Sequence, residues 1–79
     1  MKLTLDQLRY LVALAEEGSF TRAAERVYLT QPALSVQIRK LEEALGTRLF
    51  DRRKGTLTEA GRVAVAQARR VLEEVERLR

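Results

Sequence analysis

The side chains best suited to chemistry lie between residues 31 and 40, where two amides, a hydroxyl and two cations alternate with apolar groups. If this segment is a helix with its leucines inward, a rotation of about 100° per residue turns other positions outward. The outward set is Pro32, Val36, Arg39 and Lys40, with Ser35 on the flank and Gln31 at the N-terminal tip. Amide, apolar and guanidinium groups are what a DNA major groove accepts, at adenine, thymine methyl and guanine or phosphate. The alternative interpretation is a solvated helix face.

A second group of side chains surrounds two expected helix starts. Its members are Ser19, Thr21, Arg22 and Thr30. Helix N-termini offer free N–H groups and the positive end of a dipole, so these positions could bind phosphates. Helix capping alone explains the hydroxyls at least as well.

A third group is a basic segment. Between residues 48 and 54 there are four cations (Arg48, Arg52, Arg53 and Lys54) and one anion, which gives a local charge of +3. Beside a DNA-reading helix, such a segment would bind the phosphate backbone or enter the minor groove. A charge run on its own is usually just solvated, but next to a helix–turn–helix we favour DNA.

Composition narrows the function further. The chain has 79 residues, 46% apolar and 33% charged, which allows one small domain with a modest core. It lacks Cys and His, so we expect no disulfide, no metal site, no cofactor and no catalytic residues. No apolar run is long enough to span a membrane, and the net charge of +4 favours an anionic partner.

These side chains need a mainly helical scaffold. Capping residues and apolar spacing predict a helix over 5–17, a short second helix capped by Ser19 or Thr21, and a third helix over 31–45. Leu34, Ile38, Leu41 and Leu45 form the expected buried stripe of the third helix. A short two-stranded hairpin over 47–57 follows, and Thr58 caps a last helix that runs to the final residue. The closely joined second and third helices are typical of a helix–turn–helix.

The last helix carries an apolar seam longer than so small a domain can cover. The seam comprises Ala64, Ala68, Val71, Leu72, Val75 and Leu78. We expect part of it to pack on the first helix and the rest to pair with a second copy of the chain. A two-fold dimer would present its third helices to successive major grooves of an interrupted dyad site. The alternative is an amphipathic helix that closes its own core.

Several ordered blocks resemble the DNA-binding domain of LysR-type transcriptional regulators. They include Gly18–Ala24, Thr30–Ser35, Gln37–Glu42, Leu49–Arg52 and Leu57–Gly61, and the resemblance spans nearly the whole chain. It implies a winged helix–turn–helix with a three-helix core and a short β wing over 1–57, followed by a dimerising linker helix over 58–79. It also implies that Gln31, Pro32, Ser35 and position 36 meet the major groove, and that Arg52 contacts the backbone or minor groove.

Two departures from the family pattern affect the expected contacts. Position 36, often a longer polar or basic residue in the family, is Val here, so base readout at this position must differ. The wing over 48–56 looks about two residues shorter than usual, so it should reach less far.

The family also carries a larger effector-binding domain, and we expect any small-molecule effector to act only through that domain, of which this chain holds no part.

The sequence therefore predicts a bacterial, cytoplasmic, nucleoid-associated regulator module that binds double-stranded DNA sequence-specifically as a homodimer. Two other classes remain open: a sequence-blind nucleoid binder and a winged-helix module for protein interaction. An enzyme is the least favoured class, because the carboxylates form no paired constellation.

Overall fold

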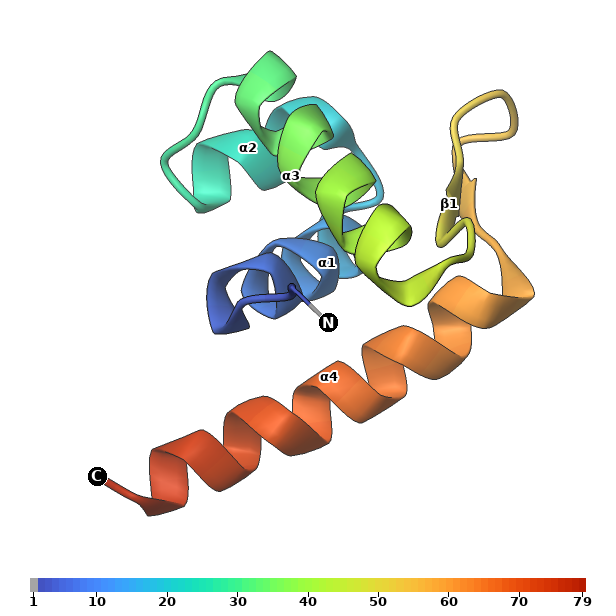
Figure 1. The fold of residues 1–79 in the computed structure, drawn as a ribbon. Helices are drawn as coiled ribbons and strands as arrows, with labels where there is room; N and C mark the ends of the chain where they lie inside the picture. The colour runs from blue at the N-terminus through green and yellow to red at the C-terminus, as the bar shows by residue number, and fades with distance from the viewer. Residues whose placement is uncertain (1) are drawn as a thin grey trace.

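The computed structural model describes residues 2–79, and its elements are four helices and one small sheet (Figure 1). In chain order they are α1 (Leu5–Glu17), α2 (Phe20–Arg26), α3 (Gln31–Leu45), β1 (Phe50–Asp51), β2 (Thr56–Leu57) and α4 (Glu59–Arg77). Helices α1, α2 and α3 enclose the core, the hairpin stands beside α3, and α4 runs beneath them. The expected winged helix–turn–helix fold is confirmed.

Capping side chains explain why the helices start where they do. Thr4 forms the expected capping box with Gln7, because its Oγ1 accepts from the Gln7 N–H at 3.1 Å and the Gln7 amide oxygen accepts from the Thr4 N–H at 3.0 Å. Ser19, Thr30 and Thr58 cap α2, α3 and α4. Of the two candidate caps for the second helix, Ser19 is the one used. The bounds expected for α1 and α3, residues 5–17 and 31–45, are confirmed.

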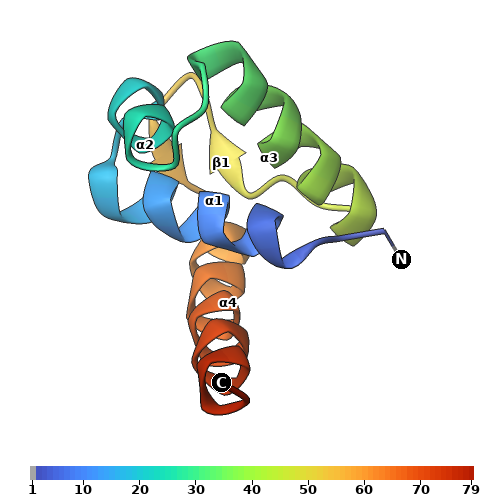
Figure 2. The same ribbon diagram turned by 90° about the vertical axis from the view of Figure 1, so that its left-hand side faces the viewer.

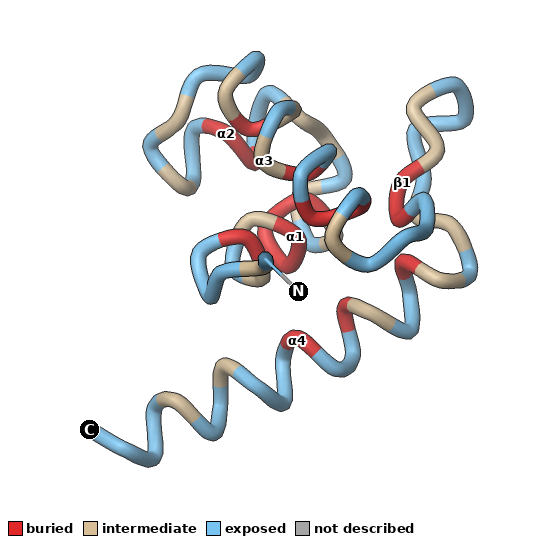
Figure 3. Tube along the Cα trace, in the orientation of Figure 1, coloured by how far each residue is buried: buried red, intermediate tan, exposed pale blue. Residues whose placement is uncertain are grey.

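The core lies where α1, α2 and α3 meet (Figure 3). Its largest fully covered side chains are Leu11, Leu14, Leu34, Ile38, Leu41 and Leu49. The expected stripe on α3 holds for its first three residues but is wrong at Leu45, which is 36% exposed. Leu45 is the last residue of α3, where the chain turns away at Gly46 and leaves the side chain partly uncovered.

The hairpin closes the core on the side of α3. Phe50 pairs with Leu57 and Asp51 with Thr56 in an antiparallel ladder, as the expected wing requires. Phe50 is buried and meets the Phe20 ring edge-on, with centroids 5.1 Å apart. Phe20 is the first residue of α2, so this contact joins the start of α2 to the wing.

Helix α4 starts inside this body and then projects from it (Figure 2). Val65 and Ala68 are buried, and α1 is the main neighbour of α4. This confirms that part of the seam packs on the first helix. The expectation that the helix runs to the final residue is wrong: it ends at Arg77, and Leu78 caps it.

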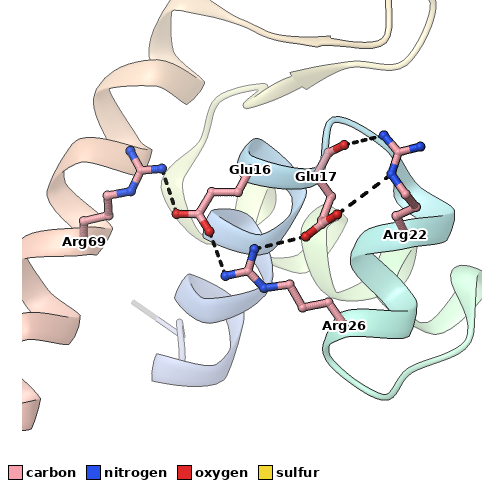
Figure 4. Close-up of polar contacts among 5 residues, drawn as sticks. All are labelled: Glu16, Glu17, Arg22, Arg26 and Arg69. Carbon is pink, nitrogen blue, oxygen red and sulfur yellow. Dashed lines mark hydrogen bonds and ion pairs between the residues drawn. The ribbon is translucent and has the colours of Figure 1, made fainter.

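An ion network joins α4 to the helix–turn–helix (Figure 4). The Glu16 carboxylate on α1 contacts Arg26 of α2 at 2.7 Å and Arg69 of α4 at 3.0 Å. Glu17 adds contacts to Arg26 at 3.3 Å and to Arg22 at 3.8 Å. Hydrogen bonds from Arg26 and then Arg69 lower the pKa of Glu16. The Glu16 carboxylate of α1 thus contacts both α2 and α4.

Candidate nucleic-acid interface

The outward face of α3 is bare. Gln31, Pro32, Val36, Arg39 and Lys40 are all exposed, and Val36 keeps 48% of its surface. The leucine stripe faces the core, so the helix turns this mixed polar and apolar face away from the protein. A free α-helical face of this width is what a major groove admits.

Ser35 is held from the wing. The Arg52 guanidinium reaches back from the end of β1 and donates through Nη1 to the Ser35 Oγ at 2.5 Å and through Nη2 to the Ser35 carbonyl at 3.5 Å. The same guanidinium lies over the Phe20 ring, 5.0 Å from its centroid. The wing, α2 and α3 therefore meet at Arg52.

Glu42 holds the other end of the same flank. It lies seven residues, or two turns, beyond Ser35, so both side chains face the wing. Its buried carboxylate accepts from the N–H of Leu49 at 2.8 Å and of Phe50 at 3.3 Å. The wing is tied to the flank of α3 at both points.

Cations gather where α3 and the wing meet. Arg39, Arg48 and Arg52 line one surface hollow together with Glu42. Burial, and then the neighbouring Arg39, lower the pKa of Arg52. Arg53 and Lys54 are exposed at the tip, where their N–H groups donate to the Asp51 carboxylate and their side chains extend from the turn. This edge of the molecule has the charge that phosphates require.

The hydroxyls expected near phosphates act as caps. Ser19 accepts from the Arg22 N–H at 3.2 Å, and Thr30 accepts from the Ala33 N–H at 3.3 Å. The Arg22 guanidinium donates to the Glu17 carbonyl at 2.7 Å, so it also has a partner within the protein. Thr21 is exposed. The capping interpretation of Ser19 and Thr30 is thus confirmed.

The seam of α4 divides into a covered and an uncovered part. Ala68 is buried within the protomer and Ala64 is partly buried, so α1 covers the first turns. Farther on, Leu72 and Val75 are partly exposed, Val71 is 42% exposed and Leu78 is 87% exposed. Ala68 therefore has no surface to offer a second copy, whereas the residues from Val71 onward do.

Residues 2–79 contain neither a cluster of metal-binding side chains nor a membrane-spanning helix. No group of three or more His, Cys, Asp or Glu side chains is placed to hold a metal ion. No helix in this part of the chain is both long and apolar enough to cross a membrane.

Three positions that shape this surface were not predicted from the sequence. Glu42 was given no structural role from the sequence, although its position on the flank beside Leu41 could have signalled burial. Phe20 was not linked to the wing, and no sequence signal joins it to Arg52. Gly61 lies in one of the family-like blocks but was given no structural role, and it packs closely on the Leu49 backbone.

Known proteins match this chain closely. Residues 5–62 fit the family described as "Bacterial regulatory helix-turn-helix protein, lysR family". The "SDS degradation transcriptional activation protein" of a Pseudomonas species is 54% identical over 77 residues, which is 95% of this chain and 25% of that protein. The first curated relatives are likewise matched over only about a quarter of their length.

Solved structures agree with the sequence matches. A complex of the BenM DNA-binding domain with catB site 1 DNA superposes with a TM-score of 0.92 at 40% identity, covering 96% of this chain and 84% of that one. Full-length OxyR C199D from Pseudomonas aeruginosa superposes with a TM-score of 0.89 at 47% identity, covering 99% of this chain and 24% of that one.

Proposed function

The chain belongs to the lysR family of bacterial regulatory helix-turn-helix proteins, and from this premise we propose that it binds double-stranded DNA sequence-specifically, as the DNA-binding module of a transcriptional regulator. In the proposed complex α3 enters the major groove and the wing lies at the backbone or in the minor groove.

One observation carries this proposal: the outward face of α3 is free, and the cationic wing stands directly beside it. Gln31, Pro32, Val36 and Arg39 would approach base edges, with Lys40 at the phosphates. Arg52, Arg53 and Lys54 would meet the backbone or the minor groove. Ser19, Thr21, Arg22 and Thr30 would surround a phosphate near the starts of α2 and α3. The family likeness to a DNA-bound domain supports this orientation.

We further propose that the protein acts as a two-fold dimer. The uncovered part of the α4 seam, chiefly Val71, Leu72, Val75 and Leu78, would pair with its counterpart in a second copy. Residues 1–57 would then be the DNA-binding unit and 58–79 the linker helix, although the first turns of α4 pack in the core. The bound site would be an interrupted dyad.

Regulation by a small molecule would need a domain beyond this chain, since the matched relatives are about four times as long. A regulator of this family has no need of catalytic residues or a cofactor. Its proposed place is the bacterial cytoplasm, on the nucleoid.

Selection of bound sites from a random DNA pool tests the proposal. Binding should fall steeply as salt rises, because neutralised phosphates release counterions. Gln31→Ala should weaken discrimination between sites by about 1–3 kcal/mol. Gln67→Ala, the same change at an exposed position on α4, is the matched control and should leave discrimination intact.

Two results would favour the other functions. If Gln31→Ala loses the same affinity for selected DNA as for random DNA, the protein is a sequence-blind binder. No salt-sensitive DNA binding at all would favour a protein-interaction module.

A further inference from the structure

The contact between Arg52 and Ser35 decides how one residue of the proposed interface can hydrogen-bond. A guanidinium can only donate, so the Ser35 Oγ must accept in this contact. A serine hydroxyl has one proton and two lone pairs, and Arg52 occupies one of the lone pairs. Within the described part of the chain no acceptor takes the Ser35 proton, so that proton remains available to an outside partner.

The surroundings hold the contact in place. Arg52 is half-buried, stacked on Phe20 and bound twice to Ser35, and it has no carboxylate within ion-pair distance among residues 2–79. A cationic donor on the oxygen polarises the hydroxyl and strengthens its O–H as a donor. Ser35 and Arg52 also line a surface hollow together with Gln31. The hydroxyl thus sits at the edge of the face proposed to read bases.

Resting on the proposed function, we propose that Arg52 is a positioning residue that orients the Ser35 hydroxyl and favours it as a hydrogen-bond donor, so that Ser35 prefers a base whose groove edge offers an acceptor. The guanine O6 and N7, the adenine N7 and the thymine O4 present acceptors in the major groove, whereas the cytosine N4 amino group presents only donors. The second Ser35 lone pair stays free to accept, but the charged donor on the first strengthens the hydroxyl proton, so Ser35 should prefer a base acceptor to the cytosine amino group. Arg52 specifies sequence here without touching that base.

The test compares site preferences of the whole chain and four variants in selection from a random DNA pool. Ser35→Ala identifies the base position that Ser35 reads, with an expected loss of preference of about tenfold. Arg52→Met keeps the length and the packing on Phe20 but cannot donate, so it should lose the preference at the same position. The double variant should lose no more than either single variant. Arg53→Met removes the same charge from the exposed neighbour and should weaken all sites equally.

Distinct outcomes overturn the inference. If Arg52→Met resembles Arg53→Met, Arg52 is only a backbone contact. If it alters a different base position from Ser35→Ala, Arg52 reads a base itself. If Ser35→Ala changes no preference, Ser35 is not the reader. A wild-type chain that selects no sequence at all would instead overturn the proposed function.

A measurement on the unmodified protein keeps the test independent of variant folding. In NMR spectra, the Arg52 Nη protons should give separate resonances, because two hydrogen bonds hinder rotation of the guanidinium. The exposed Arg53 should give averaged ones. Averaged Arg52 signals would show that the contact is not held in solution and would overturn the inference.

Discussion

The carboxylate of Glu42 accepts a hydrogen bond from the backbone N–H of Leu49 at 2.8 Å, and this bond joins the last turn of α3 to the chain that becomes the wing. Glu42→Ala would leave two buried N–H groups without a partner. We expect it to lower the free energy of unfolding by about 2–3 kcal/mol in urea titrations, because hydrogen bonds to charged groups are strong. Glu43→Ala, at the exposed neighbour, is the control and should change stability by less than about 0.5 kcal/mol. If Glu42→Ala and Glu43→Ala lowered the free energy of unfolding equally, the Glu42 hydrogen bonds would not be what stabilises the wing.

Gly61 should reverse the usual effect of glycine in a helix. Replacing a helical glycine by alanine normally stabilises a protein by up to about 1 kcal/mol. At Gly61, however, a Cβ would overlap the Leu49 carbonyl oxygen, so the wing base or α4 would have to shift. We expect Gly61→Ala to destabilise the fold by about 1–3 kcal/mol in thermal unfolding. Gln67→Ala on the same helix should be close to neutral, and a stabilised Gly61→Ala protein would contradict the close packing.

Glu16 should make stability depend on pH. Its pKa in the folded protein is below the ordinary value of 4.5, chiefly because Arg26 and Arg69 bind the charged form. The stabilisation is therefore present above that value and is lost as the pH falls through the folded pKa. Urea unfolding of wild type and Glu16→Gln should differ at neutral pH and converge in acid. High salt should also reduce the difference.

The control for this experiment is Glu74→Gln, which breaks a contact within α4 only. Its difference from wild type should be smaller than that of Glu16→Gln at neutral pH. A Glu16→Gln protein that matches wild type at every pH would show that the network adds nothing to stability.

Val71 tests the proposed dimer. A glutamate at this partly exposed seam position would place a charge in the interface between two α4 helices, where burial is costly. We expect Val71→Glu to lower the solution mass measured by analytical ultracentrifugation toward that of one chain. Val36→Glu, the same change on the free face of α3, should keep the wild-type mass. An unchanged mass for Val71→Glu would remove the seam from the interface.

Local signals predicted most of the scaffold. The capping box at Thr4, the Thr30–Pro32 start and the glycines after α1 and α3 act through neighbours in the chain, so their consequences can be read from a few residues. The exposed face of α3 was also predicted, because the residues opposite a buried apolar stripe on a helix must point away from the core.

The contacts that fix the wing could not be predicted. Arg52 meets Ser35 across 17 positions of the chain, and Glu42 meets Leu49 across seven, so each pair depends on how the hairpin folds back. Leu45 shows the converse error: its spacing indicates burial, yet the helix ends there and no neighbour covers it fully. At the end of a helix, the neighbouring elements decide whether a side chain is buried, even where its spacing matches the apolar stripe.

Leu49 is held from three sides: its N–H by Glu42, its carbonyl by the Thr58 N–H at 3.0 Å, and its backbone by contact with Gly61. These contacts hold the base of the wing against α3 and α4, so we expect α3 and the wing to present one spacing to a duplex. A duplex of any other shape has to bend or twist to satisfy both. Since that deformation is easiest at flexible pyrimidine–purine steps, selectivity should extend to base pairs that no side chain reaches.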